Sequence, residues 1–311
     1  MTTLNGNSTA GLLEAAVTEF GGRAYGLEPL VLPPDPVPGS GDAHLAERYG
    51  ELLGKGADAE PLGALGAPES AEQLFWFRWI TGHQLTFMVW QELGRRAAEA
   101  AAPASPDEMA AAARLVRGYS AMLLYTASCT RDVYQRVIRP SMALHHPGFS
   151  GAWARDYGPV RALLRGRLPA AWDGRAHALL QECTLNEAVH EGVAAKLVPD
   201  APSLLQASAG NGRTLPRNVL AVLFDTYFLT LRAPSSPSDI AAQLLRRVRV
   251  VRDDLAANGL YPGFASSRGE KPEALTAPQV EHIEHAIPQL LGDLARDAVR
   301  RSAPAAASER R

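Results

Sequence analysis

The clearest pattern of apolar positions in the chain lies between Glu72 and Arg96. Apolar side chains recur there at intervals of three and four residues, which predicts one long buried helix. Gly82 lies inside this run and costs a helix about 1 kcal/mol relative to alanine, so we expect something bulky close to the backbone there. The apolar positions are Phe75, Trp76, Phe77, Trp79, Leu85, Phe87, Met88, Val89, Trp90 and Leu93.

The same periodicity predicts further helices, and no alternating pattern typical of a strand is found. We therefore predict an all-α, single-domain helical bundle with a proline-rich N-terminal arm. Prolines in residues 30–41 exclude a regular helix and predict an extended segment. The predicted boundaries are an arm with short helices over 1–66, a helical domain over 67–301 and a disordered tail over 302–311. The predicted helices after the first cover about 106–139, 151–164, 169–198, 219–231, 238–258 and 277–301.

Charge and composition narrow the function classes. The 311 residues carry a formal net charge of −2, which favours neither nucleic acid nor an acidic membrane. No apolar run of 18 residues predicts a membrane span. Cys129 and Cys183 lie far apart within apolar helical patterns, so we interpret them as reduced core residues of a cytoplasmic protein.

His83 is the first candidate for chemistry. Trp79 lies one helical turn before it and Phe87 one turn after it, so the three side chains share a face. Such a histidine is either a core residue with a hydrogen-bond partner or a pocket group. A lone buried histidine is more often the former, and a second histidine favours the pocket.

His190 is that second histidine. Leu185, Val189, Val193 and Leu197 form an apolar stripe beside it, and Asn186 lies one turn earlier, where it can accept a hydrogen bond from the imidazole. Glu187 and Glu191 could do the same. A helical histidine with such a partner is a common proximal ligand of haem iron.

Arginines near a Gly-rich turn form the third element, in the segment from Tyr134 to Gly151. Arg139 could bind a carboxylate through its planar fork, or be a surface residue near a helix end. Arg131, Arg136 and Arg213 are alternatives. Four other histidines are open to a loop, pocket or surface role, namely His145 and His146 before Pro147 and the spaced pair His282 and His285, where a solvated face is favoured.

Taken in chain order, these elements resemble the tryptophan 2,3-dioxygenase superfamily of histidine-ligated haem proteins. The resemblance covers about residues 70–232. It rests on Trp79-Ile-Thr-Gly-His83-Gln84 with Phe87 and Trp90, on Tyr134 and Arg139 before Gly148-Phe149, and on His190 followed by the loop Ser208–Thr214. That loop reads SAGNGRT where the dioxygenases have a GTGG-type sequence. Length, the arm and the segment LNEAVH look more like the branch of bacterial haem-dependent L-tyrosine 3-hydroxylases.

The resemblance implies a haem enzyme that uses hydrogen peroxide to convert L-tyrosine to L-DOPA in antibiotic biosynthesis. It implies non-covalent haem b, because neither cysteine follows a histidine in the His-x-x-x-Cys motif of a sister branch. A homodimer or homotetramer is also implied. The alternatives are a related haem oxygenase acting on an indole or a modified tyrosine, and a helical binding protein without catalysis. For the cofactor, the resemblance implies that His190 binds the iron and that Trp79, Phe87 and Tyr134 wall the cofactor and the pocket. For the substrate, it implies that His83 transfers protons and that Arg139 binds the carboxylate. Backbone N–H groups of the loop would complete the site, from Ser208, Gly210 and Thr214.

Overall fold

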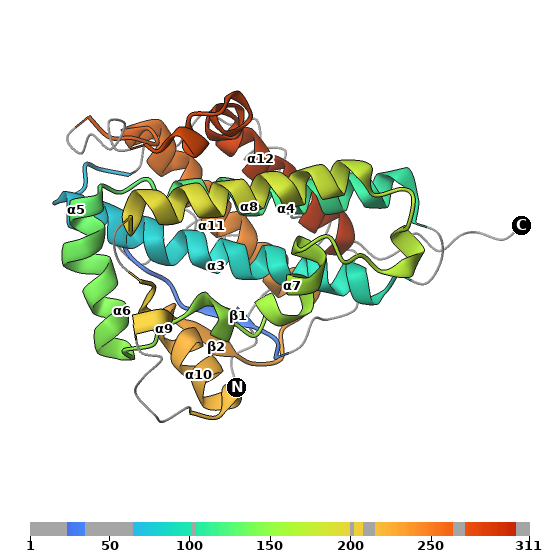
Figure 1. The fold of residues 1–311 in the computed structure, drawn as a ribbon, viewed down its shortest axis with the longest axis horizontal. Coiled ribbons are helices and arrows are strands. Elements are labelled where there is room, and N and C mark those ends of the chain that lie inside the picture. The colour runs from blue at the N-terminus through green and yellow to red at the C-terminus, as the bar shows by residue number, and fades with distance from the viewer. Residues whose placement is uncertain are drawn as a thin grey trace, which may run out of the picture.

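The computed structural model describes residues 24–34, 65–100, 104–199, 202–207, 215–263 and 271–302, and these form an all-α bundle. Figure 1 shows α3 running through the middle of the molecule. Helix α4 packs against α3, α8 and α12, and α11 packs against α3 and α12. The long helices are α3 (Ala71–Ala98), α4 (Pro106–Thr126), α8 (His177–Leu197), α11 (Pro237–Asn258) and α12 (Pro278–Ser302). The shorter ones are α5 (Arg131–Val133), α6 (Arg139–His145), α7 (Tyr157–Leu164), α9 (Leu204–Ala207) and α10 (Arg217–Tyr227).

Side-chain caps explain where the long helices begin. Ser70 accepts a hydrogen bond from Gln73 N at 3.1 Å and opens α3. Helix α4 starts with a capping box in which Ser105 and Glu108 each bind the other's backbone N–H. Such caps satisfy amide groups that the first helical turn leaves without intrahelical partners.

Gly82 marks the closest approach of α3 to α4. A Cβ atom at this position would lie 2.4 Å from Cγ2 of Thr126 and 3.1 Å from Cδ1 of Tyr125. The sequence prediction of a bulky neighbour is therefore confirmed, and the neighbour is the helix that follows. The contact fixes the spacing of the two helices that form the middle of the core.

The predicted helix over 106–139 is wrong in one respect, because the chain breaks it between Thr126 and Thr130. Ser128 Oγ donates to Tyr125 O at 2.7 Å and accepts from Arg78 Nη1 at 2.9 Å, which holds the bend. Thr130 then caps α5 by accepting from Val133 N. A π-helical turn, Tyr134–Ile138, follows and leads into α6, which ends at His145, at the predicted turn.

Two short strands were not predicted. β1 (Leu30–Leu32) pairs in parallel with β2 (Thr230–Arg232), so the predicted helix over 219–231 ends earlier, at Tyr227. Gln243 of α11 completes the pairing, since its side-chain amide accepts from Val31 N and donates to Val31 O, both at 2.7 Å. Three-residue strands are too short to show an alternating pattern, although the extended course of Leu30–Leu32 agrees with the sequence.

Smaller differences concern helix starts. The predicted helix over 169–198 begins only at His177, and the one over 151–164 begins at Tyr157, each after a short 3₁₀ turn. Pro288 lies inside α12. None of the described helices is both long and apolar enough to cross a membrane. Several predictions lie outside the described residues: the short helices of the arm, the loop residues Ser208, Gly210 and Thr214, and residues 303–311 of the tail.

Candidate functional site

His83 lies within a cage of aromatic rings. Its imidazole stacks on Phe228 at 4.4 Å between ring centroids and lies 4.3 Å from the indole of Trp79. Phe87 closes a third side at 6.4 Å. The expectation that Trp79 and Phe87 flank His83 on one face of the helix therefore agrees with these contacts.

One hydrogen bond sets the tautomer of His83. Its Nδ1 lies 2.6 Å from the carbonyl oxygen of Trp79, which can only accept, so Nδ1 carries the proton and Nε2 keeps its lone pair. Burial lowers the pKa of His83 to about 4. The structure thus indicates a neutral imidazole that can accept a proton through Nε2.

The cage contains aromatic residues that sequence reasoning missed. Phe224, Tyr227 and Phe228 come from the end of α10 and its following turn, and they contact one another and Phe149. The spacing of FDTYF, with aromatic residues three and four positions apart, was the available signal. It was hidden because the predicted helix ran through to residue 231.

Tyr134 and Arg139 lie on the far side of Trp79. The rings of Tyr134 and Trp79 meet edge to face at 5.9 Å, and burial raises the pKa of Tyr134 to about 12. Arg139 is half-buried and donates from Nη2 to Pro202 O at 2.8 Å. The alternative Arg136 is held by Asp132 and Glu72, and Arg131 donates to Lys196 O.

His190 lines a cavity of about 380 Å³. The sequence interpretation had it buried, whereas its side chain is exposed to this cavity. Trp90, Tyr119 and Tyr157 form aromatic walls, with Trp90 5.2 Å from Tyr119 and 5.0 Å from Tyr157. The full lining is Trp90, Tyr119, Ser150, Gly151, Ala152, Tyr157, Arg161, Leu164, Arg165, Asn186, Glu187 and His190.

Asn186 does not take the role expected for it. Its side-chain amide donates to Ser120 Oγ at 2.9 Å, and among the described residues no hydrogen bond joins it to His190. Desolvation lowers the pKa of His190, while the charges of Glu191 and Glu187 raise it. The net lowering favours the neutral imidazole, which is the form that binds a metal.

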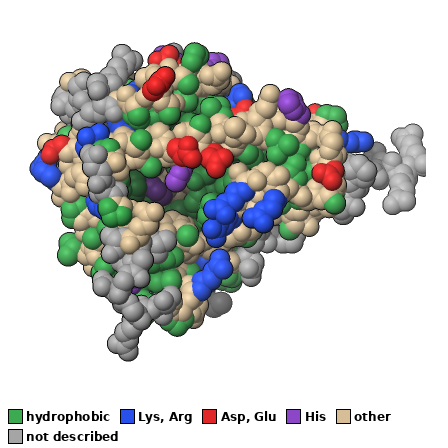
Figure 2. Space-filling view, in the orientation of Figure 1, with side chains coloured by type: hydrophobic (Ala, Val, Ile, Leu, Met, Phe, Trp, Pro, Cys, Tyr) green, Lys and Arg blue, Asp and Glu red, His purple; other side chains and the backbone are tan. Residues whose placement is uncertain are grey.

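Two arginines at this cavity have no protein counter-ion. The guanidinium groups of Arg161 and Arg165 have no ion-pair or hydrogen-bond partner within the part of the chain that the structure describes. The indole N–H of Trp90 is buried and likewise lacks a partner there. Figure 2 shows the surface hollowed below α8, with histidine side chains inside the hollow and basic side chains beside it. An anionic ligand would find both charge and a hydrogen-bond donor here.

Phe87 and Trp90 join the two parts of the candidate site. Their rings lie 5.9 Å apart on consecutive turns of α3, so the cage wall at Phe87 continues into the cavity wall at Trp90. His83 and His190 therefore belong to one connected aromatic surface. That the two imidazoles face a single porphyrin from opposite sides stays a prediction.

The remaining candidates serve other purposes. His145 Nε2 lies 2.8 Å from Leu223 O and holds the turn against α10, whereas His146 Nδ1 accepts from Gly148 N within the turn. His282 and His285 are exposed, as predicted. The described residues contain no group of three or more His, Cys, Asp or Glu that could hold a metal ion by themselves. Both cysteines are free and buried, as expected.

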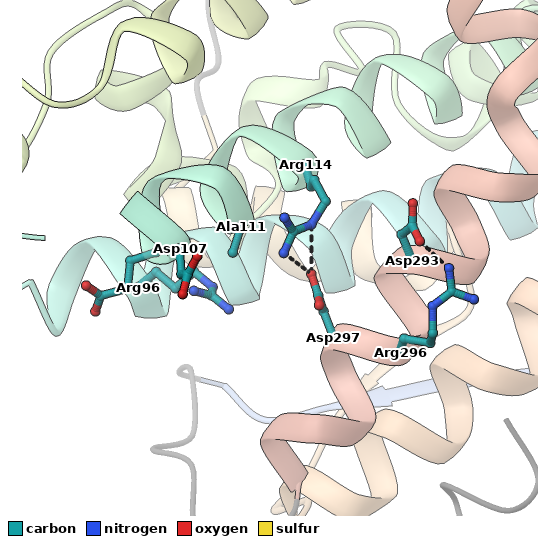
Figure 3. Close-up of a pocket in the computed structure, with 8 residues that line it drawn as sticks. Arg96, Asp107, Ala111, Arg114, Asp293, Arg296 and Asp297 are labelled. Carbon is teal, nitrogen blue, oxygen red and sulfur yellow. Dashed lines mark hydrogen bonds and ion pairs between the residues drawn. The ribbon is translucent and has the colours of Figure 1, made fainter. Parts of the chain in front are cut away.

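A larger cleft of about 690 Å³ lies where α3, α4 and α12 meet. Its charges compensate one another, since Arg114 binds Asp297 and Arg296 binds Asp293 (Figure 3). Arg96 binds Glu92 in the same way. The three arginines that line this cleft are thus paired with carboxylates, and none of its described lining residues is a histidine or cysteine. We therefore place the candidate site at the His190 cavity and the His83 cage.

One known family matches part of the chain. Residues 43–186 match the family described as SfmD 3-methyl-L-tyrosine peroxygenase. The matched range contains His83, its flanking Trp79 and Phe87, and Arg139, and it ends before His190. The match supports a relationship to a tyrosine-type peroxygenase family and leaves the branch of the superfamily open. No curated protein gives a significant match.

Proposed function

We propose that this chain is a haem peroxygenase that uses hydrogen peroxide to hydroxylate L-tyrosine at ring position 3, giving L-DOPA for the biosynthesis of an antibiotic. The observation that carries the proposal is the exposed imidazole of His190 in an aromatic-walled cavity with two uncompensated arginines. The match to a peroxygenase family over residues 43–186 supports the reaction class.

The donor set of the cavity suits haem b. His190 would supply a nitrogen to bind the iron, and Tyr119 and Trp90 would form the apolar walls. Arg161 and Arg165 would balance the charge of the porphyrin carboxylates. A bound haem supplies the oxidising chemistry with peroxide, and the protein supplies position and proton control. Attachment would be non-covalent, because neither cysteine lines this cavity.

The cage supplies proton control. His83, neutral and with Nε2 free to accept, would take a proton from peroxide or from the substrate phenol. Trp79 and Tyr134 would orient the substrate ring, and Arg139 would bind its carboxylate by the nitrogens not used on Pro202. Backbone donors from Ser208, Gly210 and Thr214 complete the proposed substrate site.

A second candidate substrate is 3-methyl-L-tyrosine, which the description of the matched family favours. The purified protein is loaded with haem, its absorption spectrum is recorded, and it is incubated with peroxide and each of L-tyrosine, 3-methyl-L-tyrosine and L-tryptophan. L-DOPA from tyrosine supports the proposal. A product from the methylated substrate alone moves the assignment to that branch, and a colourless protein that binds no haem contradicts both. Sedimentation of the holoprotein tests the proposed homodimer or homotetramer.

A further inference from the structure

Four charged side chains meet beside the candidate site, of which Asp156 and Asp225 are buried, Arg232 is largely buried and Arg155 is exposed. Asp156 directly precedes Tyr157, which lines the cavity, and Asp225 directly follows Phe224, which packs on Phe87. Arg232 of β2 lies between the two carboxylates, and Arg155 adds a second cation beside Asp225. The cluster thus contacts the backbone next to both halves of the candidate site.

The geometry of Arg232 is rigid. Its guanidinium contacts Asp156 through Nη2–Oδ2 at 2.8 Å and Nη1–Oδ1 at 3.0 Å. It contacts Asp225 through Nη2–Oδ1 at 2.7 Å and Nε–Oδ2 at 3.0 Å. Two bidentate pairs on one planar group fix distance and orientation together. The side chains of Arg232, Asp156 and Asp225 are only 12, 4 and 6 % exposed.

A third connection reaches α3. Gln91, the neighbour of the cavity residue Trp90, donates to Asp156 Oδ1 at 3.0 Å and to Pro33 O at 3.1 Å. Asp156, Asp225 and Gln91 are therefore each one residue away from an aromatic side chain of the site. Burying ion pairs seldom stabilises a fold more than apolar packing would, so what these contacts contribute is position.

We propose that Arg232 is a positioning residue, which holds the Tyr157 wall of the cavity and the Phe224–Phe228 side of the His83 cage in register. This inference rests on the proposed function. The two walls belong to α7 and α10, which are short helices separated by more than fifty residues of chain. Arg232 joins them directly through its two carboxylate partners.

Variants separate the two arms of the cluster. Arg232→Lys keeps the charge but cannot form two bidentate ion pairs. We expect it to shift the Soret band of the haem-loaded protein. It should also lower kcat/KM by about 10²-fold, the scale of a misplacement of ~1 Å. Asp156→Asn releases the cavity side and should mainly raise the rate of haem dissociation. Asp225→Asn releases the cage side and should mainly lower kcat, with haem retained.

A readout without cofactor keeps the test independent of haem. The ring NMR signals of His83 in haem-free Arg232→Lys should titrate at a higher pH than in the unaltered protein, because a looser Phe228 contact readmits water to the imidazole. Lys271→Met is the control, since it breaks another largely buried ion pair, with Glu284 at 2.6 Å. It should lower thermal stability without moving the titration of His83.

The inference is wrong if Arg232→Lys alters only the melting temperature, as the control does, and leaves the His83 titration and the Soret band unchanged. A protein that binds no haem contradicts the proposed function instead. In that case the His83 titration still decides whether Arg232 positions the cage.

Discussion

The His83 cage and the His190 cavity are built on opposite principles. In the cage, aromatic rings enclose His83, and its imidazole has one hydrogen-bond partner, the carbonyl oxygen of Trp79. The cavity is open, and its imidazole and two guanidinium groups have no partner among the described residues. A group that controls protons needs a fixed tautomer and a shifted pKa, whereas a group that binds a ligand needs unused bonding capacity. The difference assigns the two histidines to different tasks.

His190→Ala tests the binding side and should have the largest effect. Removal of the axial nitrogen should abolish stable haem loading, because no other described side chain in the cavity offers an imidazole. Absorption spectra after haem reconstitution measure this loss. Restoration of the Soret band by added imidazole would show that the cavity itself is intact, and unaltered haem binding would contradict the comparison.

His83→Ala tests the proton side. We expect haem binding to persist and turnover to fall by about 10²- to 10⁴-fold, the usual contribution of a general base. Stopped-flow measurements with peroxide and tyrosine follow this step. Phe87→Leu is a matched control, because it alters the cage and keeps the imidazole. Full hydroxylation by His83→Ala would remove His83 from the mechanism.

Arg139→Ala should act on substrate binding alone. Loss of a charge-assisted contact to the amino-acid carboxylate should raise KM by about tenfold and leave kcat unchanged. Arg136→Ala is the control on the same segment, since that arginine is already held by Asp132 and Glu72. An unchanged KM in Arg139→Ala would move the anchor to another arginine.

The double variant Arg161→Gln/Arg165→Gln tests how much the positive charge of the cavity contributes to haem binding. These exposed cations should contribute modestly to haem affinity, so we expect dissociation to accelerate by about fivefold at low salt, and less at high salt. Transfer of haem to an excess of an acceptor globin measures the rate. Arg167→Gln, an exposed arginine just beyond α7, should change nothing.

The pH dependence of stability tests His83 without cofactor or substrate. The folded pKa of His83 is about 4 and lies below the value of about 6.5 in an unfolded chain, so the unfolded state binds more protons between these values. The contribution of His83 to stability is complete above about pH 6.5 and falls as the pH decreases toward 4, by on the order of 3 kcal/mol. Urea unfolding of the haem-free protein at several pH values measures the slope. His83→Gln should flatten it.

Sequence patterns predicted the features that depend on residues close together in the chain. The periodicity of α3, the role of Gly82 and the aromatic flanks of His83 all depend on residues within a few turns, and all agree with the structure. Phe228 and Arg232 were missed because the contacts that bring them to the site, Phe228 with His83 and Arg232 with Asp156, span more than seventy residues of chain. Sequence spacing carries no record of such contacts. Asn186 was misassigned for the same reason, since Ser120, its actual partner, lies on another helix.

The wide turn over Tyr134–Ile138 carries one consequence for engineering. A π-helical turn holds one residue more than an α-helical turn, and here it separates the ring that meets Trp79 from the guanidinium that reaches Pro202. Shortening this segment by one residue would swing Arg139 around the axis by about 100°. Changing the length of this turn should therefore change which amino acids the site accepts, without substitution of the side chains around it.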